Sequence, residues 1–171
     1  MRAFIAVEVE SEKLKEVQKQ LDIHGVKLTN HFHITLKFFR EIDEKTVNKI
    51  KTILSTLKFK QFEIELDGLG VFPEPDYVKV IWVRVKSDDL LKLQKEVDEK
   101  LIEMFERDMR FSAHITLGRV KFVSDKRLLL DRLMSIKIEA EKFLVKEIRF
   151  IKSTLELEGP VYEDLAVFKA D

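Results

Sequence analysis

His33-Ile34-Thr35-Leu36 recurs as His114-Ile115-Thr116-Leu117, and these two copies organise the fold that we expect for the chain. A four-residue repeat arises by chance in roughly one chain of this length in ten, so repetition alone is weak support. Side chains alternate between the two faces of a strand, which places the His and Thr of each copy on one face and the Ile and Leu on the other. Each copy therefore predicts a strand with one apolar face anchored in a core and one polar face free to line a cleft.

The segments around the two copies predict helices and strands of an α+β protein. Apolar residues recur at helical spacing in four places, each of which follows a good helix N-cap residue: Ser11, Asp43, Ser87 and Ser124. Runs rich in β-branched and aromatic residues predict strands over residues 2–8, 33–39, 60–67, 78–86, 112–120, 137–152 and 162–168.

The order of these elements indicates an internal duplication. The helix that ends near Leu101 precedes the second copy of the motif much as the helix that ends near Leu21 precedes the first. Gly68, Gly70, Pro73 and Pro75 form the one Gly/Pro cluster, and we expect a loop there. Nothing marks a domain boundary, so we expect residues 1–171 to form a single bilobal domain.

Composition limits the classes of function. The absence of cysteine excludes disulfides, thiolate zinc sites and thiol nucleophiles. The N-terminus reaches acidic residues too early for a signal peptide and no later run is long enough to span a membrane, so we expect a cytoplasmic protein without membrane association. Thirty-one basic residues balance thirty-one acidic ones. Because gripping a long duplex by its phosphates needs a basic excess, a nucleic-acid ligand would be held locally, by its terminal nucleotides.

Two histidines on separate strands suit acid–base chemistry at phosphorus. In-line displacement places the attacking and leaving oxygens on opposite sides, so one group must take a proton while another gives one. Imidazole populates both protonation states near neutrality, which makes His33 and His114 the candidate catalytic residues. The hydroxyls of Thr35 and Thr116 could donate hydrogen bonds to the non-bridging phosphate oxygens.

Three cations just beyond the motifs are candidate phosphate ligands: Lys37, Arg40 and Arg119. Strict alternation does not place Arg119 on the cleft face unless the strand ends or bulges, and Gly118 could supply such a break before Arg119. The simpler interpretation of all three is surface charge.

Other interpretations of the histidines remain open. A single His-x-Thr is more often an ordinary strand-edge pattern, and only the duplication favours a function. His31, His33 and His114 could instead bind a catalytic zinc, although Thr35 and Thr116 would then be unexplained. Activity that survives exhaustive chelation would eliminate zinc.

A non-catalytic module that binds RNA ends is a further alternative. Binding alone does not require two imidazoles, since Lys or Arg holds a phosphate more simply. A turnover assay decides between the two classes. The remaining histidine, His24, precedes Gly25 and is expected to be a capping or surface residue.

Most of the chain resembles the 2H phosphoesterase superfamily, named for its two His-x-Thr motifs, and in particular its RNA 2′,3′-cyclic phosphodiesterase or 2′-5′ RNA ligase branch. Beyond the two motifs, the resemblance includes Arg2-Ala3-Phe4-Ile5-Ala6, Gly70-Val71-Phe72-Pro73, Val80-Ile81-Trp82-Val83, Ser153-Thr154-Leu155 and Gly159-Pro160-Val161-Tyr162. It departs where Arg40 replaces a frequent Gly and Ala113 replaces a frequent Pro.

The resemblance implies two pseudo-symmetric α+β lobes, each an antiparallel sheet with helices on its outer face, and an active-site cleft between them. It makes His33 the proton donor to the leaving 3′ oxygen, His114 the base that activates water, and Thr35, Thr116 and Arg119 the phosphate ligands. The product would be a 2′-phosphate, and the reverse reaction with an RNA 5′-hydroxyl would form a 2′-5′ linkage.

The resemblance also bears on partners. The substrates would be RNA ends with a 2′,3′-cyclic phosphate, or cyclic nucleotides. No metal and no other cofactor is implied, although nucleotide assistance in ligation is left open. We expect a monomer.

Overall fold

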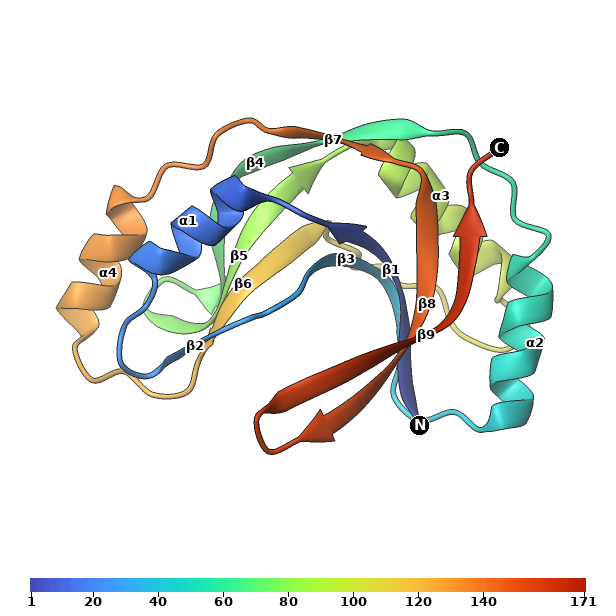
Figure 1. The fold of residues 1–171 in the computed structure, drawn as a ribbon, viewed down its shortest axis with the longest axis horizontal. Coiled ribbons are helices and arrows are strands. Elements are labelled where there is room, and N and C mark those ends of the chain that lie inside the picture. Colours follow the sequence, from blue (N-terminus) through green and yellow to red (C-terminus); the bar gives the residue numbers. More distant parts are fainter.

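The computed structural model describes residues 1–171 and arranges nine strands in two antiparallel sheets (Figure 1). Sheet A has the order β3-β1-β8-β9, with strands β1 (Arg2–Val9), β3 (Phe32–Phe39), β8 (Glu147–Glu156) and β9 (Gly159–Lys169). Sheet B has the order β2-β6-β5-β4-β7, with strands β2 (Val26–Leu28), β4 (Phe62–Glu74), β5 (Tyr77–Lys86), β6 (His114–Val120) and β7 (Lys142–Val145). The run β3-β1-β8 corresponds to β6-β5-β4, which confirms the two pseudo-symmetric lobes.

Four helices begin where capping side chains satisfy free backbone N–H groups: α1 (Glu12–Gln20), α2 (Glu44–Leu54), α3 (Asp88–Lys100) and α4 (Lys126–Ser135). Ser11, Asp43 and Ser87 each accept a hydrogen bond from the backbone N–H three residues on, as predicted. The prediction of Ser124 as the fourth cap is wrong. Asp125 caps α4 through the N–H of Leu128, while the Ser124 hydroxyl donates to the carbonyl of His24.

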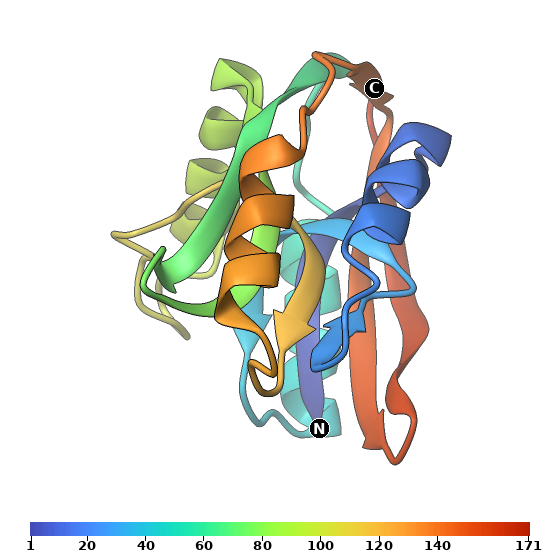
Figure 2. The same ribbon diagram turned by 90° about the vertical axis from the view of Figure 1, so that its left-hand side faces the viewer.

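The helices lie on the outer sides of the sheets, with α1 beside α4 and α2 beside α3 (Figures 1 and 2). Two of them cross between the lobes. Helix α1, which leaves sheet A, contacts β6 of sheet B, and α3, which leaves sheet B, contacts β3 of sheet A. This exchange ties each motif strand to a helix from the other half of the chain.

Each motif strand carries one extra residue relative to its neighbour. Between β1 and β3 the register skips Leu36, because Ala6 lies opposite Thr35 and Ile5 opposite Lys37. Between β5 and β6 it skips Leu117 in the same way. A bulge shifts the side-chain alternation by one position, so the residue three places after each Thr returns to the face of that Thr. That residue is Phe38 in β3 and Arg119 in β6.

Two buried glutamines, one on each exchanged helix, lie at the carbonyls of the bulged residues. Gln18 of α1 donates to the carbonyl of Leu117 at 2.9 Å, and Gln94 of α3 approaches the carbonyl of Leu36 at 3.5 Å. A bulged residue leaves the regular ladder, so its carbonyl needs a partner from elsewhere. The glutamines supply that partner at equivalent places in the two lobes.

One hydrophobic cluster runs through both lobes and fills the outer faces of the two sheets. Ile34, Leu36, Ile115 and Leu117 are all at most 1% exposed, so the prediction that the Ile and Leu of each motif anchor its strand is confirmed. A second, small cluster of Phe4, Ala6 and Ile151 lies apart from this core and packs against Tyr162.

The predicted loop at residues 68–75 is wrong, because β4 continues as a strand to Glu74. The irregular residues are absorbed as register shifts at Leu66/Leu69 and at Phe72/Pro73. Gly70 is required within the strand, since a Cβ there would lie 2.3 Å from the ring of Trp82. The predicted strand over 137–152 is divided between β7 and β8, and β2 was not predicted. None of the helices is long and apolar enough to cross a membrane.

Candidate active site

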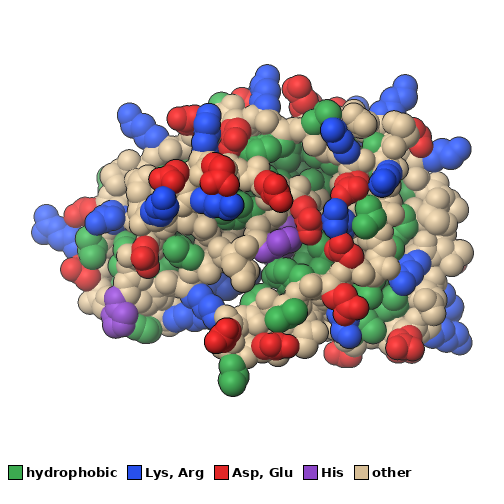
Figure 3. Space-filling view, viewed as in Figure 1, with side chains coloured by type: hydrophobic (Ala, Val, Ile, Leu, Met, Phe, Trp, Pro, Cys, Tyr) green, Lys and Arg blue, Asp and Glu red, His purple; other side chains and the backbone are tan.

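The motif side chains of both copies are partly exposed, in contrast to the Ile and Leu that alternate with them. His33 and Thr35 project from β3, His114 and Thr116 from β6, and the two strands contact each other where the lobes meet. Figure 3 shows a histidine side chain recessed in a hollow near the centre of the molecule. The structure therefore brings the two predicted motifs to one place.

His33 sits in a largely apolar setting on the inner face of sheet A. The ring of Phe4 lies 4.9 Å from the imidazole and that of Tyr162 lies 5.7 Å away, centroid to centroid. Burial, together with the positive charges of His31, His114 and Arg119, lowers the pKa of His33 from 6.5 to about 4. Two of those charges come from β6, which places the second motif within electrostatic reach of the first.

A chain of polar side chains extends from His33 away from β6. Its Nδ1 lies 3.0 Å from Nδ1 of His31, and Nε2 of His31 lies 3.0 Å from a carboxylate oxygen of Glu8. The other oxygen of Glu8 is 3.4 Å from Arg149, which also pairs with Glu147 and Asp164. This network holds the His33 ring in place through its Nδ1 atom.

His114 is held differently on the inner face of sheet B. Its Nδ1 lies 2.7 Å from the carbonyl oxygen of Ser112, which can only accept, so Nδ1 carries the proton. The rings of Phe72 and Trp82 stack on each other and lie 5.4 and 5.9 Å from the imidazole. Trp82 also holds the one buried side-chain donor without a protein partner, its Nε1–H.

The Nε2 atoms of His33 and His114 are left for a ligand. Each histidine uses Nδ1 in a hydrogen bond to the protein, whereas neither Nε2 makes one. Neither atom is among the buried unpaired polar atoms, so both are open to solvent. Two imidazole nitrogens of this kind can exchange protons with a molecule bound between the lobes.

The three candidate cations have different surroundings. Arg119 is exposed, and the bulge at Leu117 turns it to the face of Thr116, where its charge reaches His33 and Tyr162. Arg40 is exposed just beyond the end of β3. Lys37 is buried on the core face, where its amine lies 2.6 Å from Asp98 and 2.8 Å from the carbonyl of Glu106. The expectation that Lys37 binds phosphate is therefore corrected, because the equivalent bulge at Leu36 turns it inward.

Sequence reasoning missed several residues around the site. Glu8 was not considered, and Phe4, Phe72, Trp82 and Tyr162 entered only as parts of a resemblance. Alternation along β1 does place Phe4, Ala6 and Glu8 on one face, so the sequence held a signal that these side chains lie together. It could not be used, because the sequence does not show which strand lies next to β3.

The arrangement does not form the proposed zinc site. Both nitrogens of His31 are engaged, one with His33 and the other with Glu8. No group of three or more His, Cys, Asp or Glu side chains is placed to hold a metal ion. The geometry thus favours proton exchange by the two histidines.

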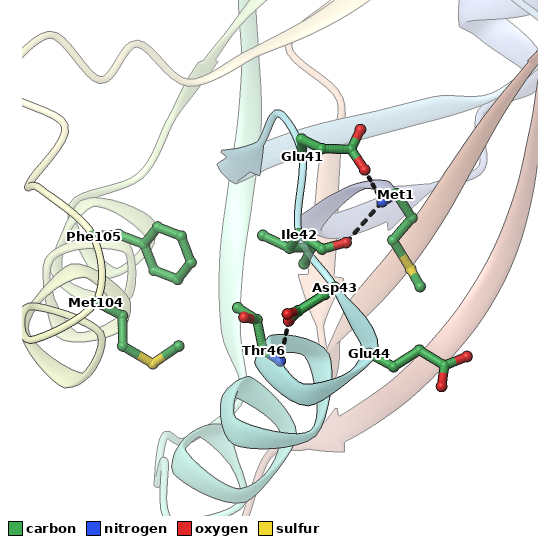
Figure 4. A pocket seen from close by; sticks show the side chains of 8 residues that line it. All are labelled: Met1, Glu41, Ile42, Asp43, Glu44, Thr46, Met104 and Phe105. Carbon is green, nitrogen blue, oxygen red and sulfur yellow. Dashed lines mark hydrogen bonds and ion pairs between the residues drawn. The ribbon is translucent and has the colours of Figure 1, made fainter.

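A separate surface pocket of about 610 Å³ lies at the N-terminus of α2 (Figure 4). The terminal ammonium of Met1 contacts Glu41 and the carbonyl of Ile42 there, and Asp43 caps the helix through the N–H of Thr46. Met104 and Phe105 face these groups across the hollow. The carboxylates of Glu41 and Asp43 already have partners, and no motif residue lines the pocket.

Comparison with known proteins agrees with this geometry. The family model for LigT like Phosphoesterase matches the chain twice, over residues 5–82 and 83–162. The chain belongs to the LigT-like phosphoesterase family. The two matches divide it within β5, between Trp82 and Val83, so each contains one His-x-Thr motif and together they cover the duplication.

Two curated relatives of this phosphoesterase are similar over almost their whole length. The RNA 2′,3′-cyclic phosphodiesterase of Methanocaldococcus jannaschii is 37% identical, over 95% of this chain and 97% of the relative. The protein of the same name from Archaeoglobus fulgidus is 38% identical, over 99% and 100%. The crystal structure of TT0787 of Thermus thermophilus matches with a TM-score of 0.83 and 25% identity, over 99% of this chain and 97% of that one. The chain is thus an enzyme with the LigT-like fold.

Proposed function

We propose that this phosphoesterase hydrolyses 2′,3′-cyclic phosphates at RNA ends to 2′-phosphates by acid–base catalysis between His33 and His114. The observation that carries the proposal is the pair of solvent-facing Nε2 atoms, one from each lobe, whose rings are both fixed through Nδ1. The names of the curated relatives supply the substrate class.

The proposed reaction needs one proton removed and one delivered. His114 takes a proton from water through Nε2, the water oxygen bonds to phosphorus, and the bond from phosphorus to the 3′ oxygen breaks. His33 gives its Nε2 proton to that leaving oxygen, which becomes a 3′-hydroxyl. The hydrogen bond from His114 Nδ1 to Ser112 supports the role of base, because it leaves the lone pair of the neutral ring on Nε2. The split of roles otherwise follows the family resemblance.

The negative charge of the substrate can raise the pKa of His33 and so favour its protonated form. In the free protein burial and neighbouring positive charges hold the pKa of His33 near 4. A cyclic phosphate brings one negative charge between the lobes, which offsets the charges of His114 and Arg119 and favours the imidazolium. We therefore expect bell-shaped pH profiles in which the limb due to His33 lies at higher pH for kcat than for kcat/KM.

Thr35, Thr116 and Arg119 are the proposed phosphate ligands. The two hydroxyls lie on the same strand faces as the two histidines, and the bulge in β6 adds the guanidinium to that face. Donors fixed in place before the reaction stabilise charge that develops on the non-bridging oxygens. Arg40 remains a predicted phosphate contact.

Turnover of an oligonucleotide that ends in a 2′,3′-cyclic phosphate tests the proposal. His33→Ala and His114→Ala should each lower kcat by about 10²–10⁴-fold, since each removes one proton-transfer group. His24→Ala is the matched control, because this histidine belongs to neither motif and packs against Phe122. Near-normal turnover by either motif variant would contradict the mechanism. Exhaustive chelation should leave the rate unchanged.

Ligation is the second reaction that this site could support. If an RNA 5′-hydroxyl takes the place of the attacking water, the same two proton transfers break the bond from phosphorus to the 3′ oxygen and form a 2′-5′ linkage. The assay above, repeated with an acceptor oligonucleotide, separates the two reactions by product length. Gel filtration of the active protein checks the expected monomer.

A further inference from the structure

His33 has an ionisable side chain as its hydrogen-bond partner, whereas His114 has a backbone carbonyl. The Nδ1 atoms of His31 and His33 are 3.0 Å apart, so one of them must carry a proton and the other a lone pair. Which atom does which depends on what His31 meets at its other nitrogen. The structure places Glu8 there, at 3.0 Å from Nε2.

Glu8 decides the direction of both hydrogen bonds. An ionised carboxylate only accepts, so Nε2 of His31 carries a proton. A neutral His31 then has its lone pair on Nδ1 and accepts the Nδ1–H of His33. The neutral His33 ring is left with its lone pair on Nε2, the atom that faces solvent.

From this chain of contacts we propose that His31, oriented by Glu8, is a positioning residue that sets the tautomer of His33 for the reaction. The role rests on the function proposed above. By holding the proton of His33 on Nδ1, His31 leaves Nε2 as the atom that exchanges protons with the substrate. The carbonyl of Ser112 has the same effect on His114.

The difference between the two partners matters when a proton is added. The Ser112 carbonyl accepts the Nδ1–H of His114 in every protonation state. His31 accepts only while it is neutral. If His33 gains a proton on Nε2, its Nδ1 proton can pass to Nδ1 of His31, which becomes an imidazolium beside the Glu8 carboxylate. One proton has then been added in total, and His33 presents an Nε2–H to the leaving oxygen.

The charged and titratable groups that face this pair come from four strands. On sheet A they are Glu8 of β1, Arg149 of β8, and Tyr162 and Asp164 of β9. On sheet B they are His114 and Arg119 of β6, whose charges reach His33. Glu8 is the one acidic side chain in contact with His31, and its second oxygen faces Arg149, which orients the carboxylate.

Two substitutions of His31 separate its hydrogen bond from its packing. His31→Asn keeps an acceptor, the amide oxygen, at the distance of Nδ1 from the chain. His31→Phe keeps a ring against Tyr162 but offers no acceptor. His24→Phe is the matched control, because His24 also packs against an aromatic ring, that of Phe122.

Nitrogen-15 NMR of the histidine rings reads the tautomer without any need for activity. In the wild type and in His31→Asn at neutral pH, His33 should show a protonated Nδ1 and an unprotonated Nε2. In His31→Phe the Nδ1–H signature should be lost. An unchanged Nδ1–H tautomer of His33 in His31→Phe would overturn the proposal.

Kinetics on the cyclic-phosphate oligonucleotide provide the second measurement. His31→Phe should lower kcat by about tenfold or more with KM within about twofold, because orientation and proton transfer suffer while binding does not. His31→Asn should recover most of kcat but lose the pH dependence that a titrating partner adds. Equal kcat for His31→Phe and His24→Phe would also overturn the proposal. If the wild type fails to turn over but shows the expected tautomer, the proposed function fails while the assigned hydrogen bond is supported.

Discussion

At the scale of single residues, His33 should make the stability of the protein depend on pH. Its pKa of about 4 in the folded state lies below the ordinary 6.5 of an unfolded chain, so between these values the unfolded chain binds more protons. The free energy of unfolding should therefore be fully retained above about pH 6.5, fall as the pH falls towards 4, and change no further below that. The full difference corresponds to roughly 3 kcal/mol.

Urea denaturation at pH 4.5 and 7.5 measures this contribution. His33→Gln removes the titrating group, so the variant should lose less stability on acidification than the wild type, by up to about 3 kcal/mol. His24→Gln serves as the control for an imidazole outside the site. Equal acid sensitivity of His33→Gln and wild type would show that His33 is not held neutral by the fold.

The buried pair of Lys37 and Asp98 yields a second prediction at this scale. Burial opposes the charge of Asp98, but hydrogen bonds from Lys37, the backbone N–H of Asp108 and Gln94 outweigh it and hold the pKa of this carboxyl below its ordinary value. Lys37→Met leaves the carboxylate buried without its counter-charge. The free energy of unfolding should fall by about 3–5 kcal/mol.

Thermal or urea denaturation of three variants checks this. Lys19→Met, in the exposed pair with Glu16, should change the free energy of unfolding little, because solvent screens that pair. The double variant Lys37→Met with Asp98→Leu should be more stable than Lys37→Met alone, since no unpaired charge remains. A small effect of Lys37→Met, similar to that of Lys19→Met, would refute the structural role assigned to the pair.

At the scale of elements, the motif strands could be predicted from sequence because their local pattern is complete. Ile34 and Ile115 face the core and His33 and His114 face the site, as strict alternation requires. Alternation failed beyond the bulges at Leu36 and Leu117. Lys37 was expected at the phosphate and is buried, while Arg119 reached the site face only through the bulge at Leu117. Gly118 is a local signal of the break before Arg119, whereas no residue of β3 signals the bulge before Lys37, because a bulge depends on the partner strand.

The exchange of helices was also beyond the reach of sequence reasoning. The spacing of Leu14 and Val17, or of Leu90 and Leu93, shows that each helix has an apolar face. It does not show which sheet that face covers, because the answer depends on the path of the connecting segments. The buried amides of Gln18 and Gln94 interrupt these apolar stripes, and in the structure they serve the bulged carbonyls of the opposite motif strand.

The close contact between Gly70 of β4 and Trp82 of β5 leads to a prediction about the aromatic side chains beside His114. A Cβ on Gly70 would lie 2.3–2.6 Å from three ring atoms of Trp82, so Gly70→Ala must displace the indole that packs against Phe72 and His114. Turnover should fall several-fold. Since Trp82 is the one tryptophan of the chain, its fluorescence emission reports the displacement directly.

Gly68→Ala is the control for this experiment. Its φ of +86° makes alanine conformationally strained, yet no atom lies within 4 Å of the added Cβ. It should lower stability without shifting the emission of Trp82. Unchanged emission and turnover in Gly70→Ala would mean that the close approach of the two strands does not position Trp82.

At the scale of the whole molecule, the continuous core predicts that the two lobes unfold together. The core cluster includes residues from both sheets, and each motif strand is covered by a helix from the other lobe. Phe150 is fully buried in sheet A, whereas Trp82 lies in sheet B. Phe150→Ala should lower the free energy of unfolding by about 3–5 kcal/mol. If the lobes were independent, that loss would not change the unfolding of sheet B that Trp82 fluorescence reports.

Urea denaturation followed by Trp82 fluorescence and by far-ultraviolet circular dichroism decides between the two cases. Fluorescence reports sheet B alone, while circular dichroism reports both lobes. Because the exchanged helices make neither lobe complete by itself, we expect the two midpoints to coincide in the wild type and to move by the same amount in Phe150→Ala. Ile64→Ala, at an equally buried position in sheet B, should produce the same coincident shift. A fluorescence midpoint that stays in place in Phe150→Ala would show that the lobes fold separately and that the two halves of the site are only loosely joined.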